Sequence, residues 1–158
     1  MFTLPYRTLM HYKRWATNGL NAVTAENFDG IAADERILVL RLLDHIQAVD
    51  EIFSHNLEVL AGKARATADW YADYADALLP EEGDEPIAFS FANGEPARMT
   101  RREMLLHVAM HAAGHRGQAA LLLQKNGIQP WPDRMTDFLK AEAAGPQRQV
   151  PLAEAAAR

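Results

Sequence analysis

Cysteine is absent from the 158-residue sequence. This absence excludes disulfide bonds, thiolate ligands to a metal ion and a cysteine nucleophile. Any thiol chemistry that the chain performs therefore needs a thiol brought in from outside. The length is that of one domain, with a hydrophobic core large enough to fold without covalent cross-links.

Long apolar runs and an excess of positive charge are also lacking. Nowhere do about eighteen apolar residues follow one another, and the amino-terminal segment has no uninterrupted apolar stretch of signal-peptide type. We therefore expect a soluble, cytoplasmic protein without a membrane partner. The net charge is −5 at pH 7, and Arg101, Arg102 and Arg116 are scattered without forming a basic stripe. Nucleic acid is accordingly not expected as a partner.

The segment 100–127 has the pattern of one long helix. Thr100 and Glu103 match a capping box at its start, and Gly127 is suited to its end. Between residues 104 and 114 no side chain carries an obligatory charge. We therefore predict that the first half of this helix is buried on most sides.

Three of the six histidines lie on this predicted helix, at His107, His111 and His115. At about 100° per residue they fall within an arc of about 80°, which also contains Gln118. Two imidazoles separated by one helical turn can bind a single metal ion, but the two four-residue steps satisfy this equally and spacing alone does not choose between them. A metal site is favoured over a role in packing, because three neutral imidazoles on one buried face would find few hydrogen-bond partners.

Apolar periodicity predicts further helices before and after this one. Lys13 falls on the polar side of the first helix, and Asp34 is suited to the N-cap of the second. Helices are expected over 3–23, 34–60 and 67–79, with one or two final helical turns over 135–140.

A β-hairpin is expected over 87–99, because Asn93 and Gly94 form a turn signal after a stretch of alternating residues. The elements together predict an all-α protein, a four-helix bundle formed by residues 1–140 with this small hairpin before the last long helix. Residues 141–158 are alanine-rich with little apolar bulk, and we expect a poorly ordered tail there.

His45 lies inside the predicted apolar stripe of the second helix. A lone histidine at such a position is usually a core residue whose ring nitrogens are satisfied. Helix bundles, however, build metal sites from facing helices, and three histidine ligands would leave one coordination position open. Nitrogen ligation suits Zn²⁺, Ni²⁺, Cu²⁺ or Fe²⁺. The residues of the predicted stripe are Leu38, Leu42, His45, Val49 and Ile52.

The segments LLDHIQAVDEIF, LLHVAMHAAGHRGQAALLLQKNG and YKRWATNGL resemble the DinB/YfiT-like family over about residues 4–140. The resemblance implies a four-helix bundle, usually a homodimer, that binds a divalent metal ion through three histidines. Zinc and nickel are the ions that we expect first. Carried onto this sequence, the ligands are His45, His111 and His115. His107 matches a position beside the site, where it would orient a ligand or face the substrate, and it is our candidate catalytic residue as a proton shuttle.

Two further sets of residues concern contacts between helices. Arg116 and Gln118 match the HRGQ signature of the family, where we expect hydrogen bonds between helices. Small side chains would let a helix of a second copy approach closely, although packing within the chain would explain them equally well. These small residues are Ala112, Ala113, Gly114 and Gly117.

The resemblance implies an enzyme that uses a low-molecular-weight thiol, because better-understood relatives are S-transferases and isomerases of that kind. A metal ion with an open position lowers the pKa of a bound thiol, so we predict a metal-dependent transferase acting on a small-molecule electrophile. A metal-dependent hydrolase is one alternative, but Asp44 and Asp50 point away from the face of His45 on an ideal helix. A non-catalytic dimeric bundle that binds metal or a small ligand is the other.

Overall fold

The computed structural model describes residues 5–58, 67–91 and 93–145, with the side chains of 55–58 left out of the description. The described part is mostly helical and contains one small antiparallel sheet, in agreement with the predicted helical class and the predicted hairpin. Short 3₁₀ turns follow α1 and precede β1. The elements are α1 (Pro5–Glu26), α2 (Ala33–Glu58), α3 (Thr67–Ala77), β1 (Pro86–Ser90), β2 (Pro96–Thr100), α4 (Arg101–Lys125) and α5 (Met135–Ala143).

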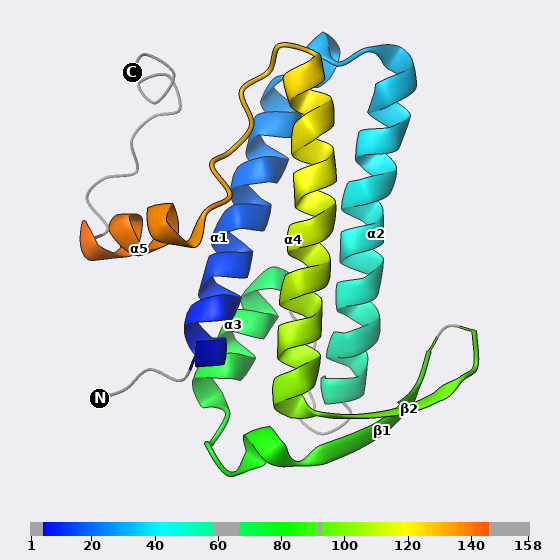
Figure 1. Ribbon diagram of the computed structural model, residues 1–158, viewed down its shortest axis with the longest axis vertical. Coiled ribbons are helices and arrows are strands. Elements are labelled where there is room, and N and C mark those ends of the chain that lie inside the picture. The colour runs from blue at the N-terminus through cyan, green and yellow to red at the C-terminus, as the bar shows by residue number, and fades with distance from the viewer. Residues whose placement is uncertain (1–4, 59–66, 92, 146–158) are drawn as a thin grey trace.

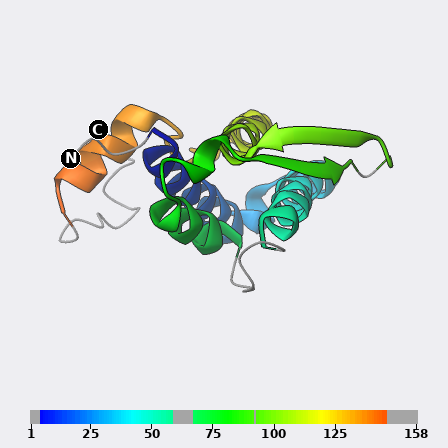
Figure 2. The same ribbon diagram turned by 90° about the horizontal axis from the view of Figure 1, so that it is seen from below.

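Helix α4 lies between α1 and α2 in the view of Figure 1 and forms one face of the helical arrangement in Figure 2. It contacts both α2 and α1 along its length, and the shorter α3 packs against α1 (Figure 1). Seen from below, α4 lies over the junction between α1 and α2, with the hairpin on one side and α5 on the other (Figure 2). This arrangement places the histidines of α4 next to α2.

The predicted start of α4 and the predicted hairpin are both confirmed. The Thr100 side chain accepts a hydrogen bond from the backbone N–H of Glu103, and the Glu103 carboxylate accepts one from the N–H of Thr100 at 2.8 Å. In the hairpin, Ile87 pairs with Met99, and Gly94 takes a positive φ of 85° in the turn. Strand β2 therefore leads directly into the capped end of α4.

The start of α2 differs from the prediction. The helix begins at Ala33, so that Asp34 lies in its first turn instead of at the N-cap. The N–H groups of Glu35 and Arg36 donate to the carbonyl of Ala32, which closes the first turn without a side-chain cap.

The buried face of α2 is also rotated relative to the predicted stripe. Val39, Ile46 and Phe53 are buried, whereas Leu38 is 47% exposed and Ile52 39% exposed. The prediction assumed that charged residues face solvent. That assumption is wrong here, because the buried face of this helix includes the two carboxylates of Glu35 and Asp50.

A buried ion pair joins α1 to α2. The Lys13 ammonium donates to the Asp50 carboxylate, and both side chains are 3% exposed. Lys13 was expected on the polar side of the first helix, and this expectation is wrong. A charge can leave water only where a partner compensates it, and the partner here comes from another helix.

The apolar core consists of two clusters with polar side chains between them. On α1, Lys13 and Thr17 lie between Met10 of the first cluster and Leu20 of the second. On α4, Arg116 lies between the two clusters and donates to Thr17 at 3.3 Å. We call Lys13, Asp50, Thr17 and Arg116 the polar layer.

The first half of α4 is less enclosed than predicted. Met104, Leu105 and Val108 are buried, but Leu106 is 49% exposed and Met110 66% exposed. The absence of charge in this segment therefore does not reflect burial on most sides.

The last helix of the described chain is longer than predicted. Helix α5 ends at Ala143, three residues past 140. Residues 146–158 of the predicted tail lie outside the described residues. Within the described ranges, no helix has the length and apolar character needed to cross a bilayer.

Candidate metal centre

Three histidines from two helices meet at the level of the polar layer. His45 comes from α2, and His111 and His115 come from α4, where they fall between Ala109 of one apolar cluster and Ala119 of the other. His45 is exposed, and the two histidines of α4 are half-buried. The cluster is therefore open to solvent on one side and enclosed by protein on the other.

The ring nitrogens of these histidines are close enough to share one ion. One nitrogen from each side chain lies within 4.8 Å of the others, and Nε2 of His111 is 3.2 Å from Nε2 of His45. Two imidazoles bound to one tetrahedral zinc ion at about 2.0–2.1 Å hold their nitrogens about 3.3 Å apart. The observed separation fits that geometry, and no carboxylate belongs to the cluster among the described residues.

The surroundings of His111 keep its ring neutral. Burial, together with the neighbouring imidazoles of His115 and His45, lowers the pKa of His111 from its usual 6.5 to about 4. Its Nδ1 atom is buried without a hydrogen-bond partner. At pH 7 one nitrogen of this ring therefore carries a free lone pair, as metal ligation requires.

His115 is oriented by a neighbour on its own helix. Its Nδ1 lies 2.9 Å from Oε1 of Gln118, which is an acceptor, so Nδ1 carries the proton. The lone pair is then on Nε2, the other ring nitrogen. Gln118 was expected to form hydrogen bonds between helices, but this hydrogen bond lies within α4. The sequence signal for it is the position of Gln118 three residues after His115 and within the same arc.

His107 lies beside the cluster and is not one of its three donors. Its ring is stacked on that of His111 with the centroids 6.1 Å apart, and its centroid lies 4.8 Å from that of the Phe53 ring. Of the two four-residue steps on α4, the structure thus brings His111 and His115 together with His45. His107 borders the site from the amino-terminal side.

The carboxylates near His45 in sequence are turned elsewhere. Asp50 pairs with Lys13 inside the protein, and Asp44 is exposed. Arg116, next to His115, donates to Asp133 at 2.8 Å and to Thr17, which joins α4 to α1 as predicted. Among the described residues, the cluster therefore contains imidazoles only. The nearby charged side chains of Asp50 and Arg116 are paired with Lys13 and Asp133.

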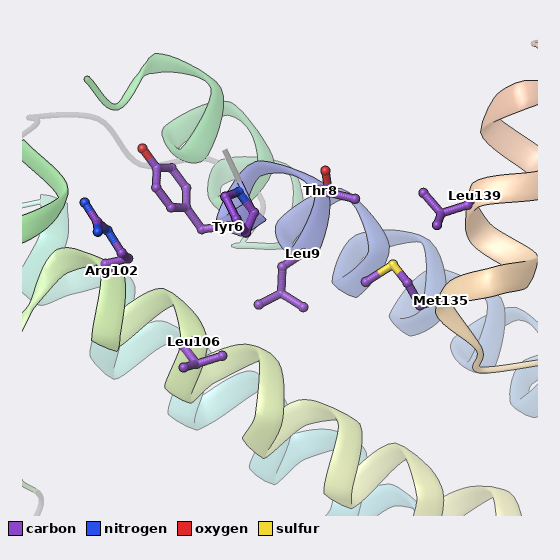
Figure 3. Close-up of a pocket in the computed structure, with 8 residues that line it drawn as sticks. Tyr6, Thr8, Leu9, Arg102, Leu106, Met135 and Leu139 are labelled. Carbon is purple, nitrogen blue, oxygen red and sulfur yellow. The ribbon is translucent and has the colours of Figure 1, made fainter. Parts of the chain in front are cut away.

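A groove of about 660 Å³ lies on a different side of α4 (Figure 3). Leu9 of α1, Leu106 of α4 and Leu139 of α5 line it, and Arg102 stands at one end. Among the described residues that line this groove, none is a histidine. The groove and the histidine cluster are therefore separate features.

Comparison with known proteins identifies the family of this chain. Searches of curated proteins and of solved structures found no match. A model of the DinB family matches residues 2–149, which is nearly the whole chain, and confirms the resemblance seen in the sequence. The chain belongs to the DinB family.

Proposed function

We propose that this DinB protein is a four-helix-bundle metalloprotein that holds a divalent ion, zinc or nickel, through His45, His111 and His115. The observation that carries the proposal is the meeting of three ring nitrogens from two helices within 4.8 Å. Imidazole is a preferred ligand of both metals, and three protein ligands leave a coordination position for substrate.

The reaction that fits this site is transfer of a low-molecular-weight thiol to a small electrophile in the cytoplasm, where thiols stay reduced. A divalent metal ion with an open coordination position would lower the pKa of a thiol bound there. The sulfur forms a bond to the electrophilic carbon, the leaving group departs with the electrons of its broken bond, and the thiol proton passes to a base. The chain has no cysteine that could compete as the nucleophile.

The residues of the chain have distinct roles in this scheme. His115 is held by Gln118 in the tautomer whose Nε2 can ligate, and His111 stays neutral because it is buried. His107 stands next to His111 without being a donor, so it is free to accept the proton that the thiol loses. Phe53, in contact with the ring of His107, limits access of water to that proton.

Turnover of 1-chloro-2,4-dinitrobenzene with glutathione tests the proposal on zinc-loaded, nickel-loaded and metal-free protein. We expect turnover only when metal and thiol are both present. His107→Gln should retain metal and lose activity by about 10²-fold or more, the usual contribution of a proton-transfer group. His11→Gln, on α1, is the matched control.

Other outcomes would contradict the proposal. Ester hydrolysis without thiol would indicate the metal-dependent hydrolase. Metal-loaded protein that turns over no electrophile with any small thiol would indicate the non-catalytic metal-binding alternative.

A further inference from the structure

The groove between α1, α4 and α5 lies apart from the candidate metal site. Its volume of about 660 Å³ falls within the range of about 300–1,000 Å³ that is usual for small-molecule sites. Leu9, Leu106 and Leu139 line it, each from a different helix (Figure 3). Leu106 is 49% exposed and Leu139 48% exposed, so a ligand in the groove would remove apolar surface from water.

The wall that α5 contributes is held against α1 by aromatic contacts. The ring of Phe138 is buried, and its centroid lies 6.0 Å from that of Tyr12 and 5.9 Å from that of Trp15. On the same helix, Met135 and Leu139 line the groove. The groove is therefore formed within the chain itself, and a ligand can enter it without a rearrangement of the helices.

The lining of the groove is polar mainly at one end. Arg102 of α4 stands there, and the hydroxyl of Tyr6 lies toward the same end (Figure 3). That hydroxyl is buried and has no hydrogen-bond partner. At the opposite end, Met135 and Leu139 present apolar side chains. A ligand that matches this lining has one polar end and an apolar body.

The guanidinium of Arg102 is held in place by the segment before β1. Its Nη2 donates to the carbonyl oxygen of Pro80 at 3.4 Å and pairs with Asp84 at 3.1 Å. The backbone of Gly83 lies so close that a Cβ added there would be 3.0 Å from Nη2. Within the described part of the chain, Nε and Nη1 donate to no acceptor, which leaves the N–H groups on both atoms unpaired.

The acidic residues around Arg102 do not occupy these N–H groups. Glu85 is paired with Arg101 at 2.6 Å, and Glu103 caps the start of α4. The side chain of Asp84 is 72% exposed, and an ion pair so exposed to water contributes little stability. A carboxylate that approaches from the groove can therefore form charge-assisted hydrogen bonds with Arg102.

We propose that the groove binds a medium-chain carboxylic acid as the free anion, with its carboxylate on Arg102 and its alkyl chain between Leu106 and Leu139. The planar guanidinium matches a carboxylate in shape and charge, and the apolar lining accepts the chain. Acids of about 8 to 12 carbons suit a groove of this volume. The site is separate from the histidine cluster and does not depend on the proposed function.

Isothermal titration calorimetry of the full-length protein with octanoate, decanoate and 1-octanol tests the chain and the charged head. Each methylene that leaves water strengthens binding about three- to fourfold, so decanoate should bind about tenfold more tightly than octanoate. Octanoate should bind about tenfold or more tightly than 1-octanol, which has the same chain length and no charge. Binding of neither acid, or equal binding of octanoate and 1-octanol, overturns the proposal.

Two substitutions in the groove are compared with matched controls. Arg102→Met keeps an unbranched stem without the charge, and it should bind octanoate about 10- to 100-fold more weakly and no better than 1-octanol. Its control is Arg98→Met, at an exposed position of β2. Leu139→Asp places a negative charge beside the alkyl chain and should weaken decanoate binding about tenfold or more. Its control is Leu121→Asp, at an exposed leucine that does not line the groove.

Circular dichroism verifies that each variant is folded. Both controls should bind decanoate as the wild type does. The His45→Ala/His111→Ala variant should also bind it normally, because the groove and the histidine cluster are separate. Loss of decanoate binding in that variant, or unchanged binding in Arg102→Met or Leu139→Asp, overturns the proposal. These results do not depend on whether the protein holds a metal ion or transfers a thiol.

Discussion

The protonation of single histidine side chains in this protein depends on the groups around them. His111 is the clearest case, because burial and neighbouring imidazoles lower its pKa to about 4 while Nδ1 finds no partner. His115 is in the opposite situation, since Gln118 fixes the position of its proton. His111 is kept neutral and His115 is kept in one tautomer, and both conditions favour ligation of a metal ion.

The depressed pKa of His111 predicts a pH dependence of stability in metal-free protein. Between its usual value of 6.5 and about 4, the unfolded chain binds a proton that the folded chain does not. The free energy of unfolding should therefore fall as the pH falls through this window. Urea unfolding in EDTA at intervals from pH 7.5 to 4.5 measures it. His111→Asn should have a shallower dependence than the wild type and than the control His11→Asn, and equal slopes in all three would contradict the assignment.

Loss of the contact between Gln118 and His115 should weaken metal binding without unfolding the protein. Removal of a group that orients a ligand typically costs about 10- to 100-fold in metal affinity. We expect Gln118→Leu to show a loss of this size in a competition titration with a coloured zinc chelator. Gln124→Leu, one to two turns further along the exposed side of α4, should bind zinc as the wild type does. If both variants bind equally, Gln118 does not position the ligand.

At the scale of elements, contacts between helices depend on charged residues that the sequence pattern wrongly places in solvent. The capping box, the hairpin and the helical class were predictable because they depend on residues close together in the chain. The buried face of α2 was not, because Asp50 is buried only by virtue of Lys13, which lies 37 positions away on α1. Periodicity treats each charge as solvated and cannot detect a partner on another helix.

The same contrast applies to the candidate site. The pattern of three histidines on one helix was visible, but the choice of His111 with His115 depends on which turn of α4 faces His45. Family resemblance proposed that choice, and the packing of α2 on α4 brings those three rings together.

The ion pair between Lys13 and Asp50 should behave as a coupled unit. Burial lowers the pKa of Lys13 and raises that of Asp50, so either residue alone in this position is unfavourable when charged. We expect Lys13→Met or Asp50→Leu alone to lower the free energy of unfolding by about 3–5 kcal/mol, and the double variant to be affected much less. Urea unfolding of the four proteins checks this, and additive losses would refute the coupling.

The contact between Gly19 of α1 and Trp131 should not tolerate a methyl group. A Cβ at position 19 would come within 2.2 Å of the Trp131 ring. Gly19→Ala should lower stability by about 1–3 kcal/mol, although alanine favours helices. Asn18→Ala, at the exposed neighbouring position, should leave stability unchanged or raise it slightly. A Gly19→Ala protein as stable as the wild type would show that Trp131 moves aside without cost.

For the whole molecule, the two apolar clusters hold the helices together, and the candidate metal site lies at the level of the polar layer between them. The histidine cluster opens to solvent from α2 and α4, and the groove lined by α1, α4 and α5 lies on a different side of α4. Residues of the candidate metal site and residues of the groove can therefore be substituted independently. This separation follows because α4 contributes different faces to the core, to the histidine cluster and to the groove.

The metal content of protein purified without a histidine tag tests the central claim most directly. Elemental mass spectrometry of the wild type and of a His45→Ala/His111→Ala variant gives the number of zinc or nickel ions per chain. The account predicts close to one ion per chain in the wild type and background in the variant, with the helical circular dichroism of both alike. Background levels in both, even after incubation with zinc and with nickel, would contradict it.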